Sequence, residues 1–149
     1  MSVHFRRVRP RELRRLPEAE VIRHWAMLYR ARGYIRVVGA SQYLGQDDTW
    51  VEVEVPHDLY EADWNVTGAD LSPSQVEHAT AYARRSGPLP PGMASFKGRD
   101  ARGKVCVIDG NHRAHASHLR GEYGARFYMP ANEWERFLAV ISDSSTPRR

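Results

Sequence analysis

The residues best suited to chemistry form one short run, Asp109-Gly110-Asn111-His112-Arg113, which follows an apolar stretch. A strand that enters a helix through a glycine turn points the first N–H groups of the helix, and the positive end of its dipole, at an anion. Gly110 permits close approach of a ligand, and Arg113 offers a planar fork of donors to phosphate oxygens. His112 can donate a hydrogen bond or carry a proton. The run therefore predicts a phosphate site made by Gly110, Asn111, His112 and Arg113.

Asp109 and the neighbouring histidines leave several interpretations open. Asp109 could bind Mg²⁺, orient His112, or cap the following helix. His112, His115 and His118 are three residues apart, so two of them could share a helix face and bind zinc with a third ligand. No Cys-x-x-Cys or His-Glu-x-x-His pattern accompanies them, so we expect His112 to face a ligand and the other two to pack or face water. Cys106, in the apolar stretch, is expected to be buried and unreactive.

The elements that must position this run follow from turn residues and hydrophobic periodicity. Ser72, Pro73 and Gln75 form a capping-box pattern that predicts the start of a helix. Alternation of apolar and acidic residues predicts a half-buried strand over 50–55, and four successive apolar residues predict a central buried strand over 104–108. Residues 11–16 are expected to form a short helical turn and 57–69 a loop. The remaining expected helices are 17–32, 111–120 and 132–141 (with Asn132 as N-cap), and the remaining strands are 34–38, 93–96 and 125–129.

The run Gly110-Asn111-His112-Arg113-Ala114-His115-Ala116, after an apolar strand and Asp109, resembles the signature of the ParB/sulfiredoxin superfamily. The order of expected elements over 50–129 resembles the same group. The resemblance implies an α+β fold, with a small mixed sheet and helices packed on it, and phosphate handling by this motif. Members include partition proteins that bind a cytidine nucleotide, sulfiredoxins that bind ATP, free-serine kinases and nucleases.

Two differences from the family pattern narrow the set of members that this chain resembles. Sulfiredoxins have a cysteine where this chain has Asn111, so repair of sulfinic acids is not expected. Partition proteins continue into a helix-turn-helix domain, whereas only 33 residues follow Ala116 here. The histidine–arginine variant is more similar to the kinase-type and small stand-alone members.

The same resemblance points to acids after the first strand of the core. Phosphoryl transfer needs cations that neutralise the phosphates and a carboxylate that places a nucleophile or a metal ion. The corresponding segment contains Asp58, Glu61 and Asp63. Glu61 is the preferred general base, with Asp63 and Asp58 as alternatives, and each could also be a solvated loop residue. Trp64, in the same segment, could stack on a nucleobase, whereas Trp25, Trp50 and Trp134 are expected to pack in or around the core.

These observations predict a nucleotide-binding protein that transfers a phosphoryl group or hydrolyses a nucleoside triphosphate. The catalytic candidates are Glu61, Asp63 and His112, and the expected cofactor is Mg²⁺ with ATP, ADP or CTP. A non-catalytic nucleotide- or DNA-binding module and a nuclease are the alternatives. The acceptor, whether a small molecule or a protein, is left open.

The length of 149 residues predicts one domain with a core of its own. Within it we expect a basic arm over 1–16, the core over 50–129, a helix over 130–141 and a flexible tail over 142–149. The single cysteine excludes an internal disulfide and fits a reducing compartment. No apolar stretch reaches the about 18–20 residues of a membrane span, and the N-terminus has no signal-peptide pattern, so a cytoplasmic protein without membrane contact is expected.

The net charge of +4 conceals an uneven distribution along the chain. Residues 1–36 contain 10 arginines and 3 glutamates, residues 37–83 contain 9 acids and no lysine or arginine, and residues 84–149 contain 12 basic residues and 6 acids. A basic block can bind phosphates, nucleic acid or an acidic partner. The acidic middle argues against a long nucleic-acid groove, so contact with nucleic acid is expected, if anywhere, through the N-terminal arginines.

Overall fold

A computed structural model describes residues 9–30, 49–62, 72–96 and 103–145, with side chains described except for 25–30 and 143–145. It contains a mixed sheet of six strands with four α-helices, which confirms the expected α+β class for the described part of the chain. The strands are β1 Arg11–Pro17, β2 Thr49–Pro56, β3 Tyr60–Glu61, β4 Gly92–Ser95, β5 Val105–Asp109 and β6 Gly124–Pro130. The helices are α1 Glu18–Arg30, α4 Pro73–Ala83, α5 Asn111–Leu119 and α6 Ala131–Ser145, and a 3-10 turn, η3, covers His57–Leu59.

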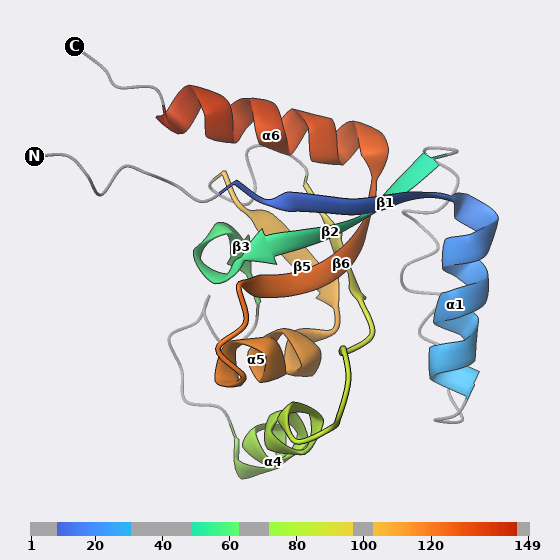
Figure 1. Ribbon diagram of the computed structural model, residues 1–149, viewed down its shortest axis with the longest axis vertical. Helices are drawn as coiled ribbons and strands as arrows, with labels where there is room; N and C mark the ends of the chain where they lie inside the picture. The colour runs from blue at the N-terminus through green and yellow to red at the C-terminus, as the bar shows by residue number, and fades with distance from the viewer. Residues whose placement is uncertain (1–8, 31–48, 63–71, 97–102, 146–149) are drawn as a thin grey trace, which may run out of the picture.

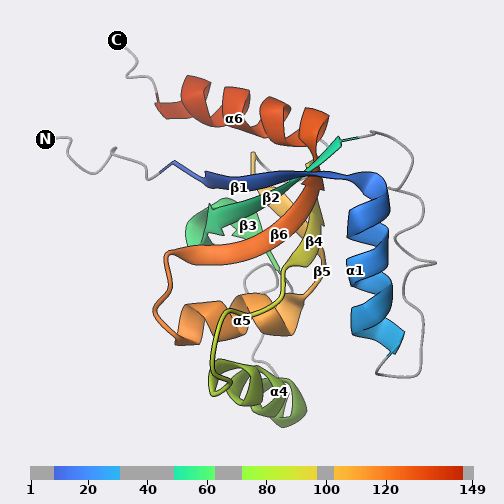
Figure 2. The ribbon, with the colours of Figure 1, turned by 45° about the vertical axis from the view of Figure 1, so that its right-hand side comes forward.

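The strand order is β1-β2-β6-β4-β5-β3. The pairs β1/β2, β2/β6 and β4/β5 are antiparallel, and β4/β6 and β3/β5 are parallel. The views in Figures 1 and 2 show α6 above and α5 below the strands, α1 beside the end of the sheet, and α5 between the sheet and α4. Because α5 lies between α4 and the sheet, α4 is positioned mainly by its packing on α5.

One hydrophobic core lies between the sheet and the helices α5 and α6. The odd-numbered residues of β2 point into it and meet Phe127 of β6 and Trp134 and Phe137 of α6. A smaller cluster on the other face joins Trp50, Met93 and Tyr128 to Leu16 and to Val21 of α1. The expectation that Trp50 and Trp134 pack in the core is therefore confirmed.

Several expected elements are wrong in position or type. Residues 11–16 are not a helical turn but the edge strand β1, because they pair in antiparallel register with β2. The segment after Pro56 is not simply a loop, since Tyr60 and Glu61 pair with β5. The sheet places β6 and β4, not β5, at its centre, and only Val105 of β5 is fully buried because its other neighbour, β3, is two residues long. Cys106 is accordingly half-buried rather than buried.

The strand β2 is covered on both faces, whereas its sequence pattern predicted a half-buried strand. Glu52 is 2% exposed and Glu54 8% exposed, although both lie on the face opposite the main core. Arginines of the neighbouring strands cover this acidic face. Alternation of apolar and acidic residues therefore does not show that the acidic face is open to water.

The observed helices differ from the expected ones mostly at their ends. The capping box at the start of α4 is present, with Ser72 Oγ accepting from Gln75 N and Gln75 Oε1 accepting from Ser72 N. Helix α6 begins at Ala131, so Asn132 lies inside the helix and is not its N-cap, and the helix continues to Ser145. The buried carboxylate of Glu133 instead accepts a hydrogen bond from Phe96 N at 2.8 Å. The expected strand over 34–38, together with Asp63 and Trp64, lies outside the described residues.

Candidate functional site at the start of α5

The turn between β5 and α5 is built around Gly110. This residue is the N-cap of α5 with φ 99°, a left-handed conformation that favours glycine, and no side chain caps the helix there. The first hydrogen bond of the helix runs from Ala114 N to Gly110 O at 2.8 Å. The N–H groups of the preceding helical residues therefore have no intrahelical acceptor, and the positive end of the helix dipole lies at this turn.

A second glycine, Gly92 at the start of β4, packs directly against this turn. A Cβ at Gly92 would lie 2.3 Å from Asp109 O, and a Cβ at Gly110 would lie 2.9 Å from Gly92 Cα. The two segments therefore meet backbone to backbone, and neither has room for a side chain. Gly110 was expected from the sequence but Gly92 was not, because its requirement arises from a contact with Asp109, 17 residues away along the chain.

Arg113 is engaged within the protein. Its Nη2 donates to Asp109 Oδ2 at 2.8 Å and its Nη1 donates to Pro91 O at 3.2 Å. The two side chains are 12% and 14% exposed. Burial lowers the pKa of Arg113, and the charge and hydrogen bond of Asp109 oppose that effect. The fork that the sequence analysis assigned to phosphate thus holds Asp109 and the approach to β4 in place, and this geometry favours a positioning role for both side chains.

His112 lies at the edge of an open hollow between α5 and α4. The hollow has a volume of about 360 Å³ and is lined by His78, Ala81, Tyr82, Arg85 and His112. The rings of His112 and His78 meet edge to face with their centroids 5.2 Å apart. A volume of this size is in the range of small-molecule sites. His112 therefore connects the start of α5 to this hollow.

The α4 side of the hollow is a stripe formed by one face of the helix and by Arg85, just beyond its end. Residues 78, 81 and 82 follow the spacing i, i+3, i+4, which places them on one face of α4. The Arg85 guanidinium lies over the ring of Tyr82, 4.6 Å from its centroid. His78, Tyr82 and Arg85 are not among the site residues expected from the sequence. The helical spacing of His78 and Tyr82 was the available signal.

Arg120, one residue beyond α5, binds the end of α4. Its guanidinium donates to the carbonyl oxygens of Ala83 at 3.1 Å, Gly87 at 2.9 Å and Tyr82 at 3.4 Å, and also to that of Arg85. These carbonyls belong to the last turn of α4 and the residues that follow it. Arg120 therefore fixes α4 against α5 at the end of the helix pair.

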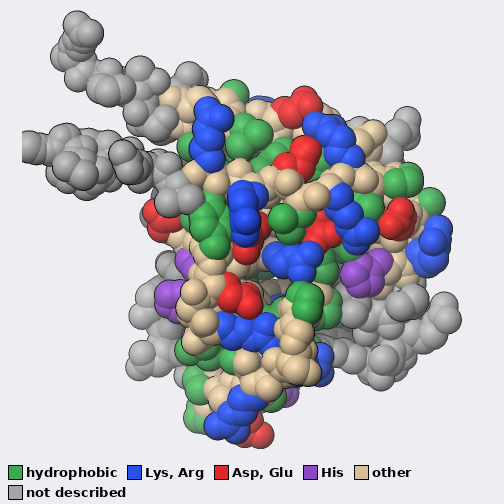
Figure 3. All heavy atoms as spheres, in the orientation of Figure 1, with side chains coloured by type: hydrophobic (Ala, Val, Ile, Leu, Met, Phe, Trp, Pro, Cys, Tyr) green, Lys and Arg blue, Asp and Glu red, His purple; other side chains and the backbone are tan. Residues whose placement is uncertain are grey.

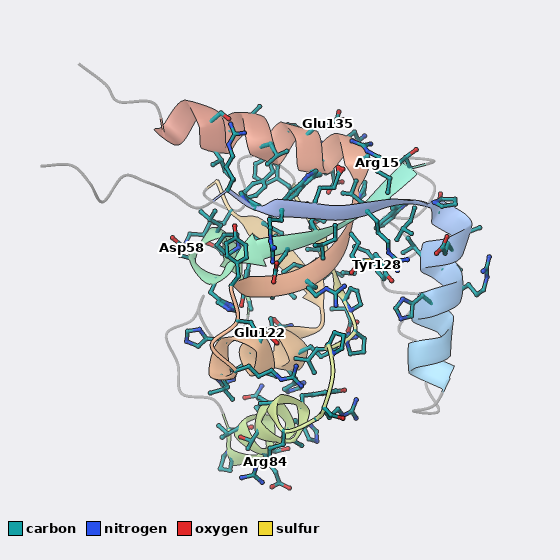
Figure 4. All side chains as sticks on the ribbon, in the orientation of Figure 1. Arg15, Asp58, Arg84, Glu122, Tyr128 and Glu135 are labelled. Carbon is teal, nitrogen blue, oxygen red and sulfur yellow. The ribbon has the colours of Figure 1, made fainter. Side chains whose placement is uncertain are left out.

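The candidate acids are distributed unevenly around the turn. Glu61 pairs with Cys106 in the parallel β3/β5 ladder, so both strands run toward the edge of the sheet where α5 begins. Cys106 precedes Asp109 by three residues, which is about 10 Å along a strand. Asp58 is exposed on η3 and points outward (Figure 4), and Asp63 lies outside the described residues. Of the acids after β2, Glu61 is the one that the described structure places on a strand beside β5.

The other histidines of α5 do not form a metal cluster with His112. His118 is exposed, and its ring centroid lies 5.0 Å from that of His57. His57 Nδ1 is 2.7 Å from Tyr60 Oη, and its Nε2 is 3.1 Å from Glu122 O, so this group lies near the far end of α5. Among the described residues no group of three or more histidine, cysteine, aspartate or glutamate side chains is arranged to hold a metal ion.

Two arginines of the N-terminal basic block, Arg11 and Arg14, are paired with acids of β2. Arg14 Nε donates to Glu52 Oε1 at 2.7 Å, Arg126 binds the other oxygen of Glu52, and Arg11 binds Glu54. The hydrogen bond to Glu52 raises the pKa of Arg14. Figure 3 shows the result, with basic and acidic side chains interleaved over the strands. These arginines therefore have intramolecular counter-charges, and the described part of the block is not a uniformly basic surface.

Comparisons with known proteins found no relative of this chain. No family model, curated protein or solved structure matches the chain. In the described part of the chain, no helix is both long and apolar enough to cross a membrane. The function is therefore inferred from the geometry around α5 and from the motif at the start of this helix.

Proposed function

We propose that this protein binds the phosphates of a nucleotide at the start of α5 and transfers a phosphoryl group or hydrolyses a nucleoside triphosphate. The observation that carries the proposal is the uncapped N-terminus of α5 at Gly110, which begins beside the hollow reached by His112. Helix N-termini of this kind bind phosphate through backbone N–H groups and the helix dipole. The likeness of the motif to the ParB/sulfiredoxin superfamily supports the same assignment.

Gly110, Asn111 and His112 are the residues proposed to contact phosphate. Gly110 lets the ligand approach the backbone, and Asn111 and His112 supply N–H groups and polar side chains at the first turn. Arg113 supports them from beneath, because its bonds to Asp109 and Pro91 fix the shape of the turn. This assignment moves Arg113 from direct phosphate contact to positioning.

Glu61 is proposed as the carboxylate that activates the attacking hydroxyl or water, with His112 able to give a proton to a phosphate oxygen. The part-exposed Glu61 lies on the strand next to β5, whereas the Asp109 carboxylate is engaged by Arg113. Glu61 therefore fits a magnesium ion better than Asp109 does, because Mg²⁺ with nucleotides is bound by one or two carboxylates, the phosphates and water. Such an ion would neutralise phosphate charge.

Binding is tested by calorimetry with ATP, ADP, CTP and GTP, each with Mg²⁺. We expect at least one nucleotide to bind, and His112→Gln to weaken that binding about tenfold or more, as loss of a charge-assisted hydrogen bond would do. His118→Gln is the matched control, because His118 is exposed on the same helix. Absence of binding to all four nucleotides would overturn the proposal.

Turnover is tested separately with Glu61→Gln. The variant should lose about 10²-fold or more in rate, as expected on removal of a general base, while its nucleotide affinity measured without Mg²⁺ stays unchanged. Full turnover in this variant would exclude Glu61 as the base. Nucleotide binding with no turnover in the unmodified protein would instead indicate a non-catalytic nucleotide-binding module.

A further inference from the structure

The stripe on α4 has a chemical character distinct from the start of α5. It presents an aromatic ring, a guanidinium that lies over that ring, and an imidazole, together with the small side chain of Ala81. Among the residues that the structure describes, no carboxylate lines the hollow. Flat aromatic and guanidinium surfaces are the groups on which nucleobases stack, and they do so with little dependence on base identity.

The stripe also has the length to receive more than a phosphate. His78 and Tyr82 are four residues apart, which is about 6 Å along the helix, and Arg85 extends the stripe beyond the helix end. The His78 end meets His112 at the start of α5, and the Arg85 end lies toward the C-terminus of α4. A ligand with its phosphates at α5 could therefore extend along α4 past Tyr82.

The stripe is held in place before any ligand binds. The capping box of Ser72 and Gln75 orders the first turn of α4, and Arg120 binds the carbonyls of its last turn. A wall fixed at both ends loses little conformational freedom on binding, and such preorganisation increases affinity.

We propose that Tyr82 and Arg85 form the base-binding wall of the site, so that the hollow selects nucleoside phosphates over phosphates that lack an aromatic base. The base packs against the Tyr82 ring and the Arg85 guanidinium, and His78 lies with His112 where base and phosphates join. This inference rests on the proposed function, since it places the phosphates at the start of α5. It adds two specificity-determining residues that lie outside the Asp109–Arg113 run.

The test compares two ligands with the same phosphate chain. One is the nucleoside triphosphate that binds most tightly, and the other is inorganic tripolyphosphate at the same free Mg²⁺. We expect the nucleotide to bind at least tenfold more tightly, and Tyr82→Ala to remove about tenfold of that preference, as alanine substitution of base-stacking residues does. Arg85→Gln should also reduce the preference, while both variants keep their affinity for tripolyphosphate.

Two controls separate stacking from general effects. Tyr82→Phe keeps the ring and should keep the preference. Arg84→Gln removes the same charge one residue away, from a side chain that lies exposed on the outer side of α4 (Figure 4). Because Arg85 is also exposed, its substitution should leave the fold intact, which a thermal unfolding curve verifies.

The outcomes distinguish this inference from the proposed function. Equal affinity for nucleotide and tripolyphosphate, or a preference unchanged by Tyr82→Ala and Arg85→Gln, would overturn the base-binding wall and leave the phosphate site standing. An equal loss of preference in Arg84→Gln and Arg85→Gln would also overturn it, because a general charge effect would then suffice. Binding of neither ligand would overturn the proposed function itself.

Discussion

The guanidinium of Arg113 and the carboxylate of Asp109 are joined across the first turn of α5 by a hydrogen bond of 2.8 Å between largely buried side chains. The same guanidinium reaches Pro91 O, so one side chain connects the end of β5, the approach to β4 and the start of α5. An arginine placed after a glycine turn is readily assigned to a ligand. Here the structure gives it internal acceptors.

Removing one member of this pair should destabilise the protein more than removing both. Asp109→Asn is expected to lower the free energy of unfolding by about 2–3 kcal/mol, because the buried guanidinium loses its counter-charge. Urea unfolding of Asp109→Asn, Arg113→Met and the double variant measures the coupling between the two residues. Strictly additive losses would contradict the proposed pairing.

Arg120→Lys should loosen α4 without unfolding the sheet. A lysine ammonium cannot reproduce the planar fork that bonds several carbonyls at once, so we expect faster amide hydrogen exchange in α4 and a loss of about 1–3 kcal/mol. Protection in β2 and β6 should change little. Unchanged exchange in α4 would show that Arg120 does not hold this helix.

Gly92→Ala should be among the most damaging small substitutions in the chain. Its Cβ would lie 2.3 Å from Asp109 O, so the turn before α5 would have to move, at a cost of about 3 kcal/mol or more. Gly87→Ala is the matched control, because its Cβ meets nothing within 4 Å and only its φ of 79° is unfavourable. That control should cost about 1–2 kcal/mol. Thermal unfolding compares the two, and equal losses would contradict the close packing.

Stability should fall as the pH drops from 7.5 to 6. Burial lowers the pKa of His24, His57 and His115 in the folded protein. Over this range the unfolded chain takes up protons that these histidines do not yet accept in the folded state, so the free energy of unfolding decreases toward acid. Urea titrations at both pH values test this, and His57→Gln should reduce the difference. Equal or greater stability at pH 6 would contradict it.

The sequence predicted best what depends on neighbours along the chain. The capping box of α4, the turn at Gly110 and the helix after it follow from local residues, and they are confirmed. The strand β1 could not be predicted in this way, because its arginines form a strand only by pairing with β2. The partial burial of β5 likewise depends on its neighbour β3, which is only two residues long.

In the candidate site, too, some features follow from the local sequence and others depend on three-dimensional contacts. The polar run at 109–113 stands out in sequence, whereas the roles within it depend on three-dimensional contacts such as that between Arg113 and Pro91. The stripe of His78, Tyr82 and Arg85 can be read partly from helical spacing. Its significance becomes clear only when α5 brings His112 against it.

The pairing of Glu52 with arginines of two different strands has a consequence for how the sheet assembles. Arg14 of β1 and Arg126 of β6 each bind one oxygen of its buried carboxylate. Side chains alternate between the faces of a strand, so a slip of β2 by one residue would turn Glu52 and Glu54 into the apolar core. Misaligned sheets would then bury unpaired carboxylates. The acidic residues of β2 therefore make wrong registers costly and favour the native alignment of the sheet.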